Sequence, residues 1–424
     1  MTEQISTQQL KDRMVAIAAD PHHPLMACAI GVVKDRTVLF ADAVGHKNLK
    51  GDPADGDTKY RIASISKLST AIGIWQLIER GLIDPDGDIS QYIGFTLRNP
   101  HHPHIPLTVK MVMSHTSSIR DGETPGSYNI PYGNPLSAFF TEGHPCYNPD
   151  CWAPREEVPG VYFQYCNMNY CLLGQMIENV SGQRFDQYTV EHIYAPMGLT
   201  CSFNVSEMPE TVKAQVGTLY RKVDASGEYD PENGVWTAQC DDFSKGYYPY
   251  VDYSDYCLGT NGSLFGPQGS LRVSVKELCQ ILLMFCNGGS HNGAQILKPE
   301  TVERMFTPVW TYDPALNNGS TYNCMMNCYG MGPHIFLNIP MGDRIAKDQI
   351  LPFEGHTAEA YGLLGGLLFD RKRGNGLIYM VAGTGSDPGQ FPGSYSSFYG
   401  WEEALLAAGA EFAQFDIPVH TFLR

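Results

Sequence analysis

The sequence predicts an α+β protein, in which helices from the two chain ends flank an antiparallel β-sheet and a mainly helical domain completes the molecule. Three observations lead to this prediction. Each chain end carries a helical pattern beside a pair of short apolar runs. The middle of the chain carries further helical patterns, and long stretches rich in Pro, Gly and Tyr separate these middle helices. Paired apolar runs form hairpins, and helices cover the sheet that the hairpins build.

The two chain ends supply the elements of the predicted sheet. Residues 8–19 alternate polar and apolar side chains at helical spacing, and the apolar runs 27–33 and 37–41 follow around a charged turn. Near the other end, runs 363–369 and 377–382 flank a charged turn with glycine, and a last helix is expected over residues 397–412. The runs predict one hairpin from each end.

The middle of the chain predicts helices. Residues 170–180 are apolar at helical spacing, and Ser274-Val275-Lys276-Glu277 forms a capping box before the apolar residues 278–285. Long aromatic-rich stretches, 95–160 and 205–265, lie between these helices. Since long loops are often functional, we expect their aromatic side chains to line an apolar cleft. The alternative is that they pack on the helices and touch no ligand.

These patterns divide the chain into two predicted domains. Residues 1–80 and 300–424 together form the sheet domain, and residues 81–299 form the mainly helical domain with its long aromatic-rich loops. The chain of 424 residues is long enough for two such units with real cores. We expect the functional site to lie between the two domains.

Composition and charge narrow the function classes. A hydrophobic content of 43% with 17% charged residues indicates a folded globular protein. The net charge of −16 argues against a nucleic-acid partner, which requires a basic surface. No apolar run approaches the ~18 residues of a membrane-spanning helix, so no membrane partner is expected.

The N-terminal residues predict a cytoplasmic protein. They are polar and lack the apolar segment of a signal peptide, so the twelve cysteines are expected to be free thiols. A leader trimmed from the natural chain would reverse this prediction. The close pairs Cys146/Cys151 and Cys324/Cys328 would then become candidates for disulfides.

The most informative motif is Ser64-Ile65-Ser66-Lys67, which opens an apolar helical segment that ends at Arg80-Gly81. A serine three residues before a lysine puts both side chains on one face of a helix, one turn apart. The N–H groups at a helix start favour negative charge, and a buried lysine loses its proton more easily, so its amine can take the serine proton. Taken alone, the motif more often marks a capping serine beside a solvated lysine.

Two later segments add chemistry to this motif. Tyr165-Cys166-Asn167 has the form Y-x-N, in which a phenol near a lysine ammonium can act as base and then as acid. Asn167 can hold a substrate amide and the lysine. The segment 354–359, Glu-Gly-His-Thr-Ala-Glu, precedes an apolar strand pair, and a strand edge there offers a backbone N–H to a developing oxyanion.

Other catalytic patterns are absent from the sequence. It contains no G-x-S-x-G, no G-x-x-x-x-G-K-[ST] and no H-E-x-x-H, which argues against α/β-hydrolase, nucleotide-binding and zinc-protease functions. His101-His102-Pro103-His104 lacks the helical spacing and the neighbouring ligands of a metal site. We therefore expect no metal and no cofactor.

The three motifs, in this order, resemble the serine β-lactamase and penicillin-binding-protein superfamily. The sequence is most similar to its class C-like branch, which includes family VIII esterases, D-amino-acid amidases and related acyltransferases. Residues 107–117 are similar to the landmark T-x-x-x-L-L-x-H-T-S-G, and residues 269–278 resemble G-G-L-x-S-x-x-D-L. The resemblance covers most of the chain and implies a β-lactamase/transpeptidase-like fold.

The resemblance also implies a role for each motif residue. Ser64 is the nucleophile that becomes acylated, and Lys67 and Tyr165 handle its proton, although either of them can be the base. Asn167 is a polar group that positions the substrate. His115, within the H-T-S landmark, is expected to be structural.

The third motif departs from the family pattern. Its triplet is His356-Thr357-Ala358, where glycine is usual third, and the alanine Cβ narrows the approach to the strand edge. The N–H groups of Ser64 and Glu359 are the implied oxyanion donors, so an acidic residue stands at that position. His356 occupies the place of Lys, His or Trp in the family. Since histidine is a poorer cation than lysine at neutral pH, β-lactam hydrolysis is disfavoured.

The predicted function is hydrolysis of a small-molecule carboxylic ester or amide through a covalent acyl-enzyme. An esterase-type reaction is favoured, with acyl transfer as a variant of it. The alternatives among enzymes are a β-lactamase and a D-amino-acid amidase or peptidase. A non-catalytic binding module, similar to penicillin-binding proteins, is the alternative from another class.

Overall fold

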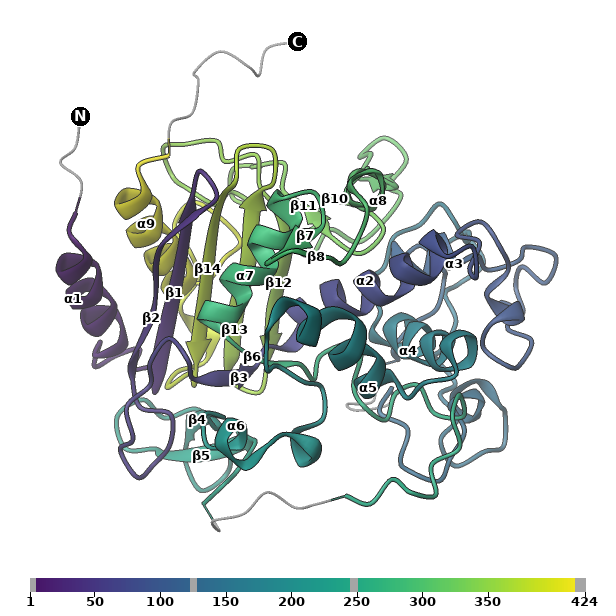
Figure 1. Ribbon diagram of the computed structural model, residues 1–424, viewed down its shortest axis with the longest axis horizontal. Coiled ribbons are helices and arrows are strands. Elements are labelled where there is room, and N and C mark those ends of the chain that lie inside the picture. Colours follow the sequence, from purple (N-terminus) through teal and green to yellow (C-terminus); the bar gives the residue numbers. More distant parts are fainter. Residues whose placement is uncertain (1–4, 123–127, 245–250, 416–424) are drawn as a thin grey trace.

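The computed structural model describes residues 5–122, 128–244 and 251–415, and an antiparallel sheet lies at its centre (Figure 1). Its eight strands follow the order β2 (Thr37–Gly45), β1 (Ala27–Lys34), β14 (Asn375–Ala382), β13 (Leu363–Asp370), β12 (Glu354–Ala360), β11 (His334–Ile335), β10 (Cys328–Tyr329) and β9 (Trp310–Thr311). The predicted α+β class is confirmed.

The hairpins from the two chain ends meet in the middle of this sheet. Strand β1 pairs with β14 in a register that sets Cys28 opposite Val381 and Val33 opposite Gly376. Both predicted hairpins are present, and β12 extends the C-terminal one on its far side. Strands β13 and β14 are buried along their whole length, as their continuous apolar runs require.

Helices cover both faces of the sheet. Helices α1 (Thr7–Ala18) and α9 (Gly400–Ala413) lie together on one face, beside β1 and β2 in Figure 1. Helix α7 (Val275–Cys286) begins with the predicted capping box and packs on the other face, where a Cβ on Gly31 would come within 2.9 Å of Cys279 Sγ. Helix α7 falls within the residues predicted to form the helical domain, and those domain boundaries stay a prediction.

The helical part lies beside the sheet, at the right of Figure 1. Helix α2 (Ser66–Glu79) runs from the sheet into it and packs against α4 (Asn167–Ser181), and the Cβ that Gly73 lacks would come within 2.9 Å of Ile177. The remaining helices are short: α3 (Val109–Met113), α5 (Phe185–Thr189), α6 (Glu210–Lys213) and α8 (Pro299–Met305). One-turn helices are η1 (Ala63–Ile65), η2 (Ile89–Gln91), η3 (Leu136–Phe140), η4 (Val190–Tyr194), η5 (Ala195–Met197), η6 (Val205–Glu207) and η7 (Pro388–Gln390).

Three small strand pairs complete the fold. They are β3 (Lys59–Arg61) with β6 (Arg272–Ser274), β4 (Leu219–Val223) with β5 (Val235–Cys240), and β7 (Ser290–His291) with β8 (Ala294–Gln295). The first pair matters for the site, because β3 leads directly into η1 and α2.

The long aromatic-rich stretches pack largely on the helical part. The Tyr253 ring lies 5.9 Å from that of Tyr132 and 5.0 Å from that of Phe265. Residues 123–127 and 245–250 of these stretches lie outside the described residues.

Two expectations about the chain as a whole can be compared with the structure. Over the ranges that the structure describes, every helix is too short or too polar to cross a lipid bilayer. All twelve cysteines are free thiols, including the close pairs Cys146/Cys151 and Cys324/Cys328.

The ion pair between Arg272 and Asp241 is expected to be a main support of the β3–β6 pair. Its two nitrogen–oxygen contacts measure 2.7 and 3.0 Å, and both side chains are buried. Replacing Asp241 with alanine leaves a buried guanidinium without its carboxylate, so we expect a loss of about 3–5 kcal/mol in the free energy of unfolding in urea.

The matched control is Asp57→Ala, which breaks the exposed pair of Asp57 with Lys276. This change should cost less than about 1 kcal/mol. Equal losses of unfolding free energy in the two variants would show that the buried ion pair stabilises the protein no more than the exposed one.

Candidate active site

Ser64 lies in η1, the single helical turn between β3 and α2. Ala63, just before it, has a left-handed backbone with φ of 44°, a conformation that costs an alanine about 1–2 kcal/mol. The turn is held from its flanks, because Leu271 N donates to Ser66 Oγ at 3.1 Å and Ile62 N donates to Leu271 O at 3.0 Å. Strain of this kind is often found where a reactive side chain must be presented at a set angle.

The Lys67 amine is surrounded by oxygen atoms. Nζ lies 2.7 Å from Asn167 Oδ1, 2.8 Å from the Gln268 carbonyl oxygen and 3.2 Å from Ser64 Oγ. An amide oxygen and a carbonyl oxygen can only accept, so they take the two N–H bonds of a neutral amine. The remaining lone pair of that amine then faces the Ser64 hydroxyl and can accept its proton.

The environment of Lys67 favours the neutral amine. The side chain is fully buried, and burial lowers its pKa to about 7, while the negative charge of Asp121 acts in the opposite direction. Among the described residues, Lys67 forms no salt bridge with a carboxylate. A lysine in this state has a substantial neutral fraction at neutral pH, which a general base requires.

Tyr165 lies beside the same amine. Its ring centroid is 4.8 Å from Lys67 Nζ and 4.4 Å from that of His115, whose ring is tilted by 30°. Burial raises the pKa of the Tyr165 phenol well above its ordinary value, although Ser64 opposes the shift. Its Oη is buried beside the Ser64 hydroxyl, whose interaction opposes the shift, and it has no other hydrogen-bond partner among the described residues. Tyr165 is therefore a neutral phenol that can exchange a proton with Ser64 or with a group bound beside it.

Asp121 holds the start of α4, and sequence reasoning missed it. Its carboxylate accepts from the backbone N–H groups of Asn167 and Met168, both at 2.8 Å, and from Asn167 Nδ2 at 2.9 Å. These contacts leave Asn167 Oδ1 directed at Lys67. Asp is a common helix cap, but this one is far from its helix in the sequence, so no local pattern predicts it.

His356 lies beneath the site and does not line its cavity. The ring is fully buried, Nδ1 donates to the Thr357 carbonyl oxygen at 2.6 Å, and Nε2 accepts from the Tyr329 hydroxyl at 2.9 Å. Burial and then the nearby Lys67 lower the pKa of His356 to about 3. The imidazole is therefore neutral, and neither nitrogen is free for a substrate.

Glu359 and Thr357 lie on the other face of β12 from His356, because side chains alternate along a strand. Both line a cavity of about 400 Å³ that also contains Ser64 and Tyr165. The structure thus brings Ser64, Lys67, Tyr165 and Asn167 into contact and sets Glu359 in the same cavity. The predicted roles of the six residues stay predictions.

The walls of this cavity correct one expectation. Its described lining contains no residue of the stretches 95–160 and 205–265, whose aromatics were expected to surround Ser64. The walls come instead from two later loops, through Tyr322, Asn323, Met325, Met326, Ser397, Phe398 and Tyr399. Those side chains belong to connections around the sheet edge, which carry no periodic pattern in the sequence.

One of these wall loops has an unusual backbone. Tyr322, Asn323 and Cys324 are three successive residues with positive φ, of 50°, 56° and 58°. Left-handed residues normally occur singly, because each costs about 1–2 kcal/mol. Gln164 Nε2 donates to Tyr322 Oη at 2.7 Å, so the turn is tied to the segment that carries Tyr165.

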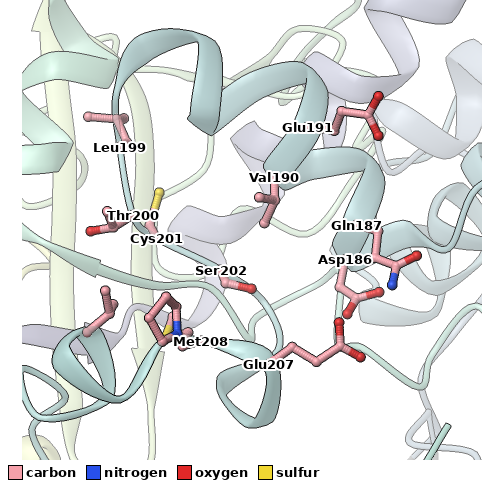
Figure 2. Close-up of a pocket in the computed structure, with 12 residues that line it drawn as sticks. Asp186, Gln187, Val190, Glu191, Leu199, Thr200, Cys201, Ser202, Glu207 and Met208 are labelled. Carbon is pink, nitrogen blue, oxygen red and sulfur yellow. The ribbon is translucent and has the colours of Figure 1, made fainter.

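A larger cavity, of about 540 Å³, lies elsewhere and is shown in Figure 2. Two of its three carboxylates are already paired, since Arg184 forms salt bridges with both Asp186 and Glu207, and the third, Glu191, is largely exposed. Burial raises the pKa of the Cys201 thiol at its wall well above its ordinary value, so that thiol is unreactive. This cavity contains no serine beside a lysine, and the smaller one is the candidate active site.

Within the residues that the structure describes, no three side chains of His, Cys, Asp or Glu gather closely enough to hold an ion. The arrangement around Ser64 is that of a nucleophile with its own proton acceptor.

Comparison with known proteins agrees with this geometry. The Beta-lactamase family model matches residues 17–394. "Protein flp" of Staphylococcus aureus (strain N315) is 26% identical over 200 residues, which cover 46% of this chain and 38% of that protein. The chain therefore matches well under half the length of this curated relative.

Solved structures share the fold. The octameric penicillin-binding protein homologue from Pyrococcus abyssi superposes with a TM-score of 0.64 and 22% identity, over 91% of this chain and 75% of that one. The D-stereospecific amidohydrolase from Streptomyces sp. superposes with a TM-score of 0.60 and 19% identity, over 97% of this chain and 100% of that one. At these identities the likeness concerns the fold alone.

Replacing Asp121 with asparagine should slow the reaction of Ser64. The two backbone N–H groups donate to different carboxylate oxygens, and in asparagine one of these oxygens becomes an NH2 donor, so at least one N–H loses its acceptor and Asn167 and Lys67 shift. Because small misplacements of reacting groups are costly, we expect labelling of Ser64 by a fluorophosphonate to slow about 10- to 100-fold. The labelling rate is followed by intact-protein mass spectrometry.

The control for lost helix capping is Ser6→Ala, which removes the cap of α1, a helix that does not contribute to the Ser64 cavity. Both variants should lose about 1 kcal/mol of stability, while only Asp121→Asn slows labelling. Equal labelling rates in the two variants would rule out a positioning role for Asp121.

Proposed function

This chain belongs to the Beta-lactamase family, and we propose that it hydrolyses a carboxylic ester or amide through an acyl-enzyme on Ser64. Members of this family are typically serine hydrolases. One observation carries the proposal. The buried Lys67 amine, with its pKa lowered to about 7, has oxygen acceptors for two N–H bonds and faces the Ser64 hydroxyl with its third position.

In the first step, Ser64 Oγ attacks the substrate carbonyl carbon. The new Oγ–C bond forms as the hydroxyl proton passes to the neutral Lys67 amine, and the carbonyl π electrons move to its oxygen. The N–H groups of Ser64 and Glu359 are proposed to hold that oxyanion, a contribution of about 3 kcal/mol for each donor. The contact between η1 and β12 supports this pairing.

In the second step, the bond to the leaving group breaks. Tyr165 donates its phenolic proton to the departing alcohol or amine and regains one from the Lys67 ammonium. The raised pKa of Tyr165 and its buried hydroxyl support the role of acid, and the geometry of Lys67 supports the role of base. The sequence alone leaves these two assignments open.

Water then restores the enzyme. It attacks the acyl carbon, gives one proton to the neutral Lys67 amine, and displaces Ser64 Oγ, which takes a proton back. The products are a carboxylic acid and the free serine. An alcohol or amine in place of water gives acyl transfer by the same steps.

The third motif supports an esterase-type reaction over β-lactam hydrolysis. The neutral, fully bonded His356 offers no cation for the carboxylate of a β-lactam. Glu359 in the cavity repels that carboxylate, and the Ala358 Cβ occupies space at the strand edge.

The role of Ser64 is tested with a series of short p-nitrophenyl esters and with nitrocefin. We expect the wild-type protein to hydrolyse the esters, to cleave nitrocefin slowly or not at all, and to lose kcat/KM by about a thousandfold or more in Ser64→Ala. The exposed Ser226→Ala is the control and should leave turnover unchanged. Fast nitrocefin cleavage would indicate a β-lactamase, and ester turnover that survives in Ser64→Ala would refute the proposed nucleophile.

The base role of Lys67 predicts a pH dependence. The lowered pKa means that the amine is protonated and inactive below about pH 7 and neutral above it. The kcat/KM for a neutral ester should therefore rise about tenfold per pH unit below pH 7 and level off above it. Because Asp121 raises the pKa of Lys67, the Asp121→Asn variant should show the same rise in kcat/KM at a lower pH. A rise in kcat/KM only near the ordinary lysine pKa would contradict the lowered pKa of Lys67, and a profile without any rise would exclude Lys67 as the base.

A further inference from the structure

Two carboxyl groups face the cavity that contains Ser64. Glu359 extends from β12 into it and reaches solvent, and Glu402 lies at its inner wall, at the start of α9. Glu402 has a structural explanation, since it accepts from the Tyr399 N–H as part of the α9 capping box and from the Tyr379 hydroxyl. Glu359 is bonded more weakly, by the Tyr399 hydroxyl at 3.3 and 3.5 Å.

No positive charge balances these two groups inside the cavity. None of the described residues that line it is lysine or arginine, and Glu359 forms no ion pair within the described part of the chain. Arg221 lowers the pKa of Glu359 from a distance, but its guanidinium lies over the Tyr229 ring, 5.7 Å from the centroid.

The pKa values of both carboxyl groups reflect the cost of holding negative charge in this cavity. Burial raises the pKa of Glu359, and burial raises the pKa of Glu402 to about 7, to which the charge of Glu359 adds. Glu402 is buried whereas Glu359 is exposed, so this cost falls mainly on Glu402. A positively charged ligand beside Glu359 would offset the repulsion between the two carboxylates.

The other walls suit an ammonium group on an apolar chain. Tyr322 and Tyr399 line the same cavity, and aromatic rings attract cations through their faces. Met325 and Met326 line it as well. The cavity thus combines a carboxylate, aromatic rings and apolar side chains around one nucleophile.

We propose that the Ser64 cavity selects acyl substrates that carry a positively charged amine, which Glu359 binds. The proposal rests on the hydrolysis proposed above and gives the substrate class: a cationic carboxylic ester or amide. Glu359 determines this specificity through its side chain, while its backbone N–H is the proposed oxyanion donor. The amine therefore lies on the same side of the cavity as the reacting carbonyl.

The proposal is tested with three p-nitrophenyl esters of similar length and different charge. They are the esters of ε-aminocaproate, heptanoate and adipate, whose far ends are an ammonium, a methyl and a carboxylate. We expect kcat/KM to fall in that order, with about tenfold between the first two. In Glu359→Gln the cationic ester should lose about five- to tenfold and heptanoate should stay within about twofold.

The control for a general change in surface charge is Glu232→Gln. Glu232 is exposed on the turn before β5 and does not line the cavity. This variant should keep the wild-type order of the three esters. Equal rates for the three esters in wild type, an equal loss for heptanoate in Glu359→Gln, or the same loss in Glu232→Gln would each overturn the proposal.

A binding measurement separates this proposal from the proposed reaction. Titration calorimetry on Ser64→Ala compares hexylammonium with hexanol, and the same pair is measured on Ser64→Ala with Glu359→Gln. A preference for hexylammonium that disappears with Glu359 supports the cation site even if no ester is turned over. Equal binding of the two probes refutes the cation site even if the esters are hydrolysed.

Discussion

The burial of one lysine is the constraint on which the rest of the site depends. Lys67 is fully buried, no carboxylate of the described residues forms a salt bridge with it, and its hydrogen-bond partners are the oxygens of Asn167, Gln268 and Ser64. A charged amine in that place is costly, and this cost brings the lysine pKa down to about 7. Asn167 and Gln268 lie about 100 and 200 residues from Lys67 in the sequence, so only folding brings this environment together and lowers the pKa.

The surrounding structure keeps those three oxygens in position. Helix α4 starts at Asn167 because Asp121 accepts its first N–H groups, and the segment around Gln268 and Leu271 is joined to η1 by hydrogen bonds. Ala63 remains in a left-handed conformation because its neighbours are fixed in this way. Stability and reactivity are therefore coupled: the contacts that hold η1 and α4 also direct the hydroxyl and the amine toward each other.

The charge distribution separates this cavity from one built for anionic substrates. His356 is neutral below it, and the two carboxyl groups that face it are Glu359 and Glu402. Strand β12 carries both the neutral imidazole and the carboxylate, because alternate residues of a strand point to opposite faces. The buried imidazole belongs to His356, and the exposed carboxylate belongs to Glu359, three residues later. In the proposed function, Ser64 therefore serves as the nucleophile while the residues of the third motif determine which substrates the cavity binds.

The amino-acid sequence by itself determined the features that rest on local spacing. Apolar runs with short polar turns predicted both hairpins, the capping box at Ser274 predicted the start of α7, and the three-residue spacing predicted that Ser64 and Lys67 share one face. The tertiary structure alone decided the contacts between distant segments: the cap by Asp121, the Gln268 carbonyl at Lys67, the neutral His356, and cavity walls from Tyr322 and Tyr399 rather than from the long aromatic stretches. The reason is physical, since spacing along the chain sets which side chains share a face, whereas burial and protonation depend on groups that only folding brings together.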